Sequence, residues 1–166
     1  YSGTVRLNGI NASDDYYFLF CDATLTVELL NGSANTLVST HGDRCINVNT
    51  LKLCGNGTLT VTTKDAGFNG IRAWKHYVPD NSNYPNTQDT SVDVTSLLSA
   101  DPEQYTVTRS ARTDGPDNDN NGTPDYYTWT YTVRPLIDLS SLDGDYVAQD
   151  GDVLTGAHWQ PQDFHR

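Results

Sequence analysis

Apolar residues alternate with polar ones along most of this chain, and that period of two constrains the fold more than any other feature. In ATLTVELL at 23–30, Leu25, Val27 and Leu29 fall on one face and polar side chains fall on the other. GTLTVTTK at 57–64 repeats the pattern. A strand with one buried face gives this alternation, because its successive side chains point to opposite sides. The sequence therefore predicts β-strands.

Further strands are expected between clusters of Gly, Asn, Asp and Ser. They are 3–10, 16–21, 36–40, 46–53, 71–78, 91–95, 104–110 and 126–134. Short strands separated by turns at intervals of about ten residues are typical of a sandwich or barrel. We therefore expect an all-β protein, an antiparallel β-sandwich of immunoglobulin-like or jelly-roll-like type.

The length of 166 residues fits one domain with a short addition. We place the sandwich at 1–136. Residues 137–166 are expected to be a C-terminal extension that can form a strand and pack on the same or a neighbouring domain.

The net negative charge of the chain argues against some classes of binding partner. The formal net charge is -11, from 21 acidic and 10 basic residues. So acidic a surface repels phosphate backbones and anionic lipid, which argues against nucleic acid and membrane insertion. No apolar run approaches the roughly 20 residues that a spanning helix needs. We expect a mature extracellular or cell-surface chain whose targeting segment has been removed.

The most chemically specific stretch is DGPDNDNNGTPD at 114–125. Counted from Asp117, oxygen ligands fall at positions one, three, five, seven and nine, with Gly122 at six. They are the side chains of Asp117, Asp119, Asn121 and Asp125 and the backbone carbonyl of Thr123. Calcium takes six to eight oxygens, and a glycine permits the sharp turn that brings alternate residues inward. This spacing predicts a Ca²⁺ site.

The pattern D-x-D-x-N-G-x-x-D resembles the calcium loops of thrombospondin type 3 repeats and, more loosely, the EF-hand loop. The resemblance covers this loop alone. Thr128 stands where an EF-hand has a bidentate Glu, so further ligands are expected from water, Asp114, Asp143 or Asp145. The alternative is a solvated acidic turn held by hydrogen bonds from Asp and Asn side chains.

Four N-x-S/T sequons occur, at Asn11, Asn31, Asn56 and Asn121, all in contexts typical of exposed turns. Asn121 cannot serve both as an inward calcium ligand and as a glycan carrier. We therefore expect glycosylation at Asn11, Asn31 and Asn56.

The three cysteines, Cys21, Cys45 and Cys54, make an odd count. A disulfide between Cys45 and Cys54 would close an irregular hairpin. Pairing of Cys21 with either of the others, or three buried free thiols, are the alternatives.

Two aromatic groups are candidates for sugar binding, because aromatic rings stack on pyranose rings. In YYTWTYTV at 126–133, Tyr127, Trp129 and Tyr131 share one face. Core packing is the commoner role for such a row, and we expect it here, in the most strongly β-forming stretch. The second candidate surface is Trp74, Tyr77 and Tyr84, around a long loop.

No motif indicates an enzyme. The four His lack metal-ligand spacing, and there is no nucleophile elbow or phosphate loop.

The preferred hypothesis is a structural or adhesive subunit of an extracellular assembly, such as a filament, pilus, surface layer or adhesin. Self-association into a homopolymer, or binding to other surface proteins, would use strand exchange by residues 2–10, although an ordinary edge strand is the commoner case. The alternative is a calcium-stabilised carbohydrate-binding module or lectin that binds glycans.

Overall fold

The structure is a computed structural model that describes residues 2–73 and 98–156. The elements are β1 (Ser2–Leu7), β2 (Asn11–Asp14), β3 (Leu19–Ser39), β4 (Arg44–Thr63), η1 (Gly67–Asn69), β5 (Gly70–Ala73), β6 (Tyr105–Arg109), β7 (Thr113–Asp114), β8 (Tyr127–Asp138), η3 (Leu139–Ser141) and β9 (Val153–Thr155). The predicted β class is confirmed. No helix in these two ranges is long and apolar enough to cross a membrane.

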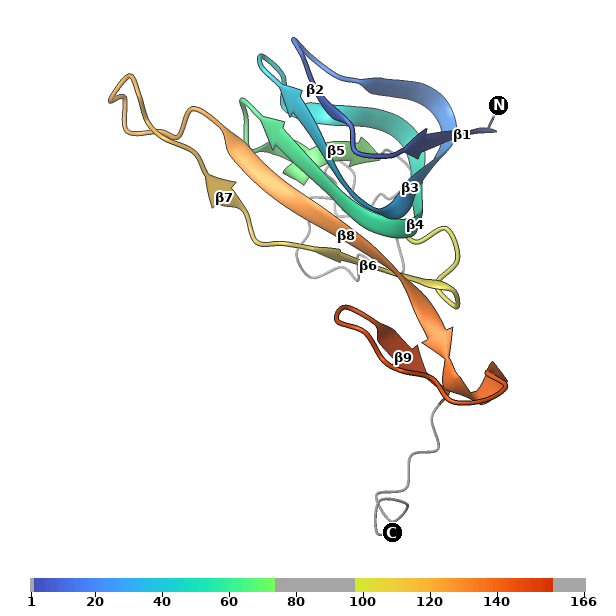
Figure 1. The fold of residues 1–166 in the computed structure, drawn as a ribbon. Helices are drawn as coiled ribbons and strands as arrows, with labels where there is room; N and C mark the ends of the chain where they lie inside the picture. Colours follow the sequence, from blue (N-terminus) through green and yellow to red (C-terminus); the bar gives the residue numbers. More distant parts are fainter. Residues whose placement is uncertain (1, 74–97, 157–166) are drawn as a thin grey trace, which may run out of the picture.

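The long strands β3 and β4 run parallel and side by side, bending together around the core (Figure 1). Ser2 lies beside Thr24, and Leu19 lies beside Ile46, so stacked residues are 22 and 27 positions apart. β1 and β2 continue the parallel stack on one side of β3, and β5 continues it beyond β4. The chain therefore winds as a short β-solenoid, in which the strands of each turn pair in parallel with the strands of the turn before.

The predicted antiparallel sandwich is not confirmed, because the sheet is mixed. Antiparallel pairing occurs where β8 lies between β4 and β6 and where β7 joins β8. The alternation of apolar and polar residues is the same for a half-buried strand in either direction. The pattern therefore predicts the buried face correctly but carries no information about the direction of the partner strand.

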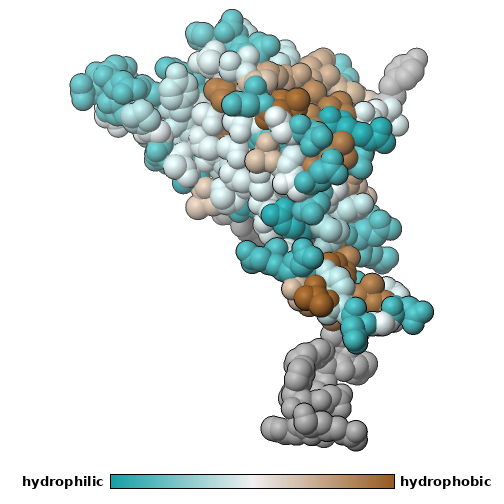
Figure 2. Space-filling view, viewed as in Figure 1, coloured by the Kyte–Doolittle hydropathy of each residue, from teal (hydrophilic) through white to brown (hydrophobic). Residues whose placement is uncertain are grey.

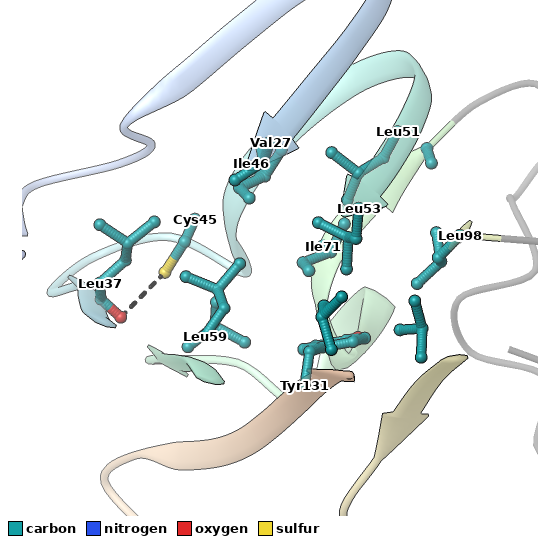
Figure 3. Close-up of a cluster of buried hydrophobic side chains, with 14 of the residues drawn as sticks. Val27, Leu37, Cys45, Ile46, Leu51, Leu53, Leu59, Ile71, Leu98 and Tyr131 are labelled. Carbon is teal, nitrogen blue, oxygen red and sulfur yellow. Dashed lines mark hydrogen bonds between the residues drawn. The ribbon is translucent and has the colours of Figure 1, made fainter. Parts of the chain in front are cut away.

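The core lies inside the turns, where inward side chains of successive turns stack (Figure 3). Val5, Val27 and Leu53 form one such row, and Leu37 and Val61 form part of another. Val27, Leu53 and Val61 are fully buried. At about 25 cal/mol per Å² of apolar surface removed from water, the burial of these rows stabilises the stacked turns.

β8 closes one side of the solenoid by pairing antiparallel with the last part of β4, from Gly57 beside Val133 to Thr63 beside Tyr127. Its inward side chains Trp129 and Tyr131 are 2% and 0% exposed. The expectation that this aromatic row is core rather than a sugar platform is thus confirmed for both rings.

Threonines cover the outer side of the same strands. The Oγ1 atoms of Thr60 and Thr130 are 3.1 Å apart, and those of Thr62 and Thr128 are 2.9 Å apart. These cross-strand hydrogen bonds satisfy half-buried hydroxyls and help to fix the register between β4 and β8.

β8 runs across the boundary predicted at 136/137. Its residues Leu136, Ile137 and Asp138 pair in parallel with β9, so the described part of the extension is joined to the main sheet by a shared strand. Figure 1 shows η3 and β9 projecting from the body of the molecule.

Candidate functional site

The acidic stretch forms the tip of the long hairpin between β7 and β8, away from the solenoid (Figure 1). The backbone N–H of Asn121 donates to Asp117 Oδ1 at 3.0 Å, and that of Gly122 donates to Asp117 Oδ2 at 2.8 Å. These bonds, chiefly the one from Gly122, lower the pKa of Asp117. Gly122 has a φ of +85°, as expected for a tight turn. The loop is thus organised by side-chain to backbone hydrogen bonds.

The structure brings some of the predicted calcium ligands together but not all. Asp119 Oδ1 accepts from the same Asn121 N–H, at 3.2 Å, so the carboxylates of Asp117 and Asp119 converge. By contrast, Asn121 Oδ1 accepts from the N–H of Thr123 at 2.8 Å, and Asp125 Oδ2 accepts from Asn118 Nδ2 at 2.7 Å. No three His, Cys, Asp or Glu side chains gather into a metal-holding group in the described ranges. Asp117 and Asp119 thus converge, while the side chains of Asn121 and Asp125 are engaged in hydrogen bonds within the loop, and calcium binding at this loop stays a prediction.

The expected additional ligands have different surroundings. Asp114 forms a two-point ion pair with Arg112, at 2.6 and 3.1 Å. Asp143 and Asp145 follow η3, which lies at the opposite end of β8 from the acidic tip (Figure 1). The strand predicted at 126–134 already lies between these segments in the sequence, and β8 extends it to Asp138.

The expected disulfide between Cys45 and Cys54 is not formed, since all three cysteines are free thiols. The predicted hairpin is not formed, because both residues belong to β4, which pairs with β3, β5 and β8 and not with itself. Cys45 is fully buried and its thiol donates to the backbone oxygen of Leu37 at 3.4 Å (Figure 3). Cys21 and Cys54 are partly buried.

The asparagines of the predicted glycosylation sites are all exposed. Asn31 has a φ of 56°, in a bend of β3. Asn56 Oδ1 accepts from Arg134 Nη1 at 3.1 Å. Exposure is compatible with modification, and glycosylation at Asn11, Asn31 and Asn56 stays a prediction. The candidate sugar surface of Trp74, Tyr77 and Tyr84 lies outside the described residues.

The β1 and β2 end of the solenoid has open strand edges. In the described part of the chain, both strands pair with β3 and have no partner on their other side. Apolar atoms gather at this end (Figure 2). Ile10, Tyr17 and Phe20 are 40%, 44% and 57% exposed, and the rings of Tyr17 and Phe20 stack with centroids 5.7 Å apart. This end therefore combines unpaired backbone groups with exposed apolar side chains.

A pocket of about 420 Å³ opens beside η1, between the ends of β6 and β8. It is lined by Ala66, Asn69, Arg109, Ser110, Ala111, Arg112 and Trp129. Sequence reasoning missed this site, because its walls come from three separate segments. The available signal was the pair Arg109 and Arg112, two of only 10 basic residues in an acidic chain.

Comparisons with protein-family models, curated proteins and solved structures found no match to this chain. The function must therefore be argued from the residues themselves.

Proposed function

We propose that this protein is a non-catalytic structural or adhesive subunit of an extracellular assembly, and that copies associate through the β1 and β2 end. The open edges of these strands carry the proposal. Unpaired N–H and C=O groups on a strand edge are a template for a strand of another chain. The neighbouring aromatic pair, Tyr17 and Phe20, supplies apolar area of the kind that contributes most at interfaces.

Self-association is expected to depend on that aromatic pair. The double variant Tyr17→Ser, Phe20→Ser should raise the concentration at which oligomers form by at least about tenfold, because it removes two aromatic anchors. Light scattering across a dilution series measures this. Added salt should favour the oligomer, since each chain carries a formal net charge of -11 that opposes association.

The matched control is Val147→Ser, which removes an 81% exposed apolar side chain in the C-terminal projection. It should leave association unchanged. Hydrogen exchange should also show that amides of β1 become protected as the oligomer forms. A chain that stays monomeric at all concentrations, or a control variant that disrupts oligomers equally, would rule out this interface.

Calcium binding at the acidic tip is a further part of the proposal, supported by the ligand spacing and by the convergence of Asp117 and Asp119. Asn121 and Asp125 would have to exchange their present hydrogen bonds for the cation. Calcium at about 100 times its dissociation constant should stabilise the fold by about 2.7 kcal/mol, because it binds only the folded state. For a chain of this size, that corresponds to a rise in Tm of about 5–10 °C over the value in EGTA.

Asp117→Asn with Asp119→Asn should abolish the calcium-dependent rise in Tm. Asp143→Asn should not, because Asp143 lies at the far end of β8. If calcium and EGTA give the same Tm for the unmodified chain, the acidic stretch is a solvated turn and the calcium part of the proposal is wrong.

The second candidate function is glycan binding, as a carbohydrate-binding module or lectin. The buried positions of Trp129 and Tyr131 weigh against the aromatic row as its platform. The observation in its favour is the pocket beside η1, whose lining has the chemistry considered next.

A further inference from the structure

Arginine is the ionisable residue type in the described lining of the pocket beside η1, although the chain as a whole is acidic. Acidic residues outnumber basic ones by 21 to 10 in the chain, yet the ionisable residues among the described lining are two arginines, Arg109 and Arg112. A concave site lined by one sign of charge concentrates ligands of the opposite sign. The pocket is therefore expected to select an anion.

Arg112 is held in a fixed orientation. Its Nε and Nη2 atoms donate to the two carboxylate oxygens of Asp114, at 2.6 and 3.1 Å. Its guanidinium carbon lies 5.0 Å from the ring centre of Tyr127. A guanidinium fixed in this way loses little conformational entropy when a ligand binds.

Arg109 is anchored from the core side. Its guanidinium hydrogen-bonds to the phenol of Tyr131, whose hydroxyl in turn donates to the backbone oxygen of Asn69 at 2.9 Å. Burial raises the pKa of Tyr131, so the phenol stays neutral and does not cancel the positive charge of Arg109. The chain from Asn69 through Tyr131 to Arg109 ties β6, β8 and η1 together at the pocket.

The remaining lining is apolar or uncharged. Ala66 and Ala111 offer carbon surface, while Ser110 holds the wall in place through its bonds to Ala111 O and Thr130 N, each 2.9 Å. The volume lies within the range of about 300–1,000 Å³ that is usual for small-molecule sites. A bare inorganic anion would leave this carbon surface uncovered. A ring that carries a carboxylate would cover it.

We propose that this pocket binds a carboxylate-bearing sugar unit, such as a uronic acid residue of an acidic polysaccharide. The carboxylate lies between Arg109 and Arg112. The Nε and Nη2 atoms of Arg112 are bound to Asp114, so Arg112 donates to the ligand through Nη1. The sugar ring lies against Ala66 and Ala111. The site is complete within one chain, so it does not depend on self-association through the β1 and β2 end.

Titration calorimetry of the full chain with galacturonate trimer, its neutral galactose counterpart and inorganic phosphate tests this assignment. The acidic trimer should bind at least about tenfold more tightly than either of the other two probes, because it alone satisfies both the arginines and the carbon surface. Arg109→Gln and Arg112→Gln should each weaken its binding by about tenfold or more.

Arg6→Gln is the matched control, since it removes one positive charge from an exposed ion pair with Glu28 in a different part of the fold. It should change the affinity by less than about twofold. Circular dichroism and Tm check that each variant is folded, and Arg112→Gln, whose partner Asp114 is solvent-exposed, remains informative if Arg109→Gln is not.

Four results would overturn the assignment. These are equal affinity for the neutral trimer, equal affinity for phosphate, equal weakening by Arg6→Gln, and no heat of binding for the acidic trimer up to about 10 mM. A monomeric chain that binds the trimer would support the site while refuting the proposed assembly, so the two proposals can fail separately.

Discussion

Gly55→Ala is expected to lower the free energy of unfolding by about 3–5 kcal/mol. Gly55 lies beside Leu29 where β4 passes over β3, and it has a φ of +90°. An added Cβ would lie 2.2 Å from the backbone oxygen of Leu29. The left-handed backbone costs a residue with a side chain about 1–2 kcal/mol, and the clash must be relieved by moving backbone, which costs about as much or more. Urea unfolding followed by circular dichroism measures the loss.

Gly32→Ala is the matched control. Gly32 has a φ of +68°, but its Cβ would meet nothing within 4 Å. This variant should therefore lose about 1–2 kcal/mol, from the backbone strain alone. If the two variants lose the same amount, the close contact between Gly55 and Leu29 is not present in solution, and the stacking of β4 on β3 at this bend is wrong.

The same bend explains why the solenoid could not be predicted from the sequence. The distance in sequence between stacked residues is 27 at Leu19 and Ile46, 26 at Leu25 and Leu51, and 24 at Leu37 and Val61. The register shifts at the two bends of β3, so no fixed period links one turn to the next. The inward faces depend only on local alternation and were predictable. The partner of each strand depends on the length of every bend.

The repeated sequence TLTV shows the same limit. Its two copies begin at Thr24 and Thr58, but the structure places Thr24 beside Thr50 and Thr58 beside Ala34. The copies therefore belong to different sides of the solenoid. The match reflects what a half-buried strand requires and not a structural repeat, and a search for repeats by identity alone would give the wrong stacking.

The two candidate sites also differ in how far the sequence alone predicts them. The acidic tip was predictable as a turn, because its Asp, Asn and Gly residues act on neighbours within nine positions along the chain. Its separation from Asp143 was also predictable in outline, because the strand expected at 126–134 lies between them in the sequence. The pocket is entirely a product of tertiary structure, since Asn69, Arg109 and Trp129 meet only once β8 has paired with both β4 and β6.

The buried thiol of Cys45 should make the fold sensitive to alkaline pH. Burial raises the pKa of Cys45 from 9.0 to about 11, against the smaller effect of hydrogen bonds from the backbone. Below pH 9 the thiol is protonated in both the folded and the unfolded chain, so it adds no pH dependence. Above pH 9 the unfolded chain releases this proton first, and stability falls as the pH rises toward 11. Each pH unit in this window costs about 1.4 kcal/mol, or about 2–3 kcal/mol in total.

Cys45→Val tests this prediction, because it keeps a small apolar side chain in the core and removes the proton. Urea unfolding at pH 8 and at pH 11 should show a smaller loss of stability for the variant than for the unmodified chain, by about 2–3 kcal/mol. Burial also raises the pKa of Tyr131, so some alkaline loss should persist in the variant. If both chains lose the same stability between pH 8 and pH 11, the thiol of Cys45 is not buried in solution. The packing of Cys45 against Leu37 at this end of the core is then wrong.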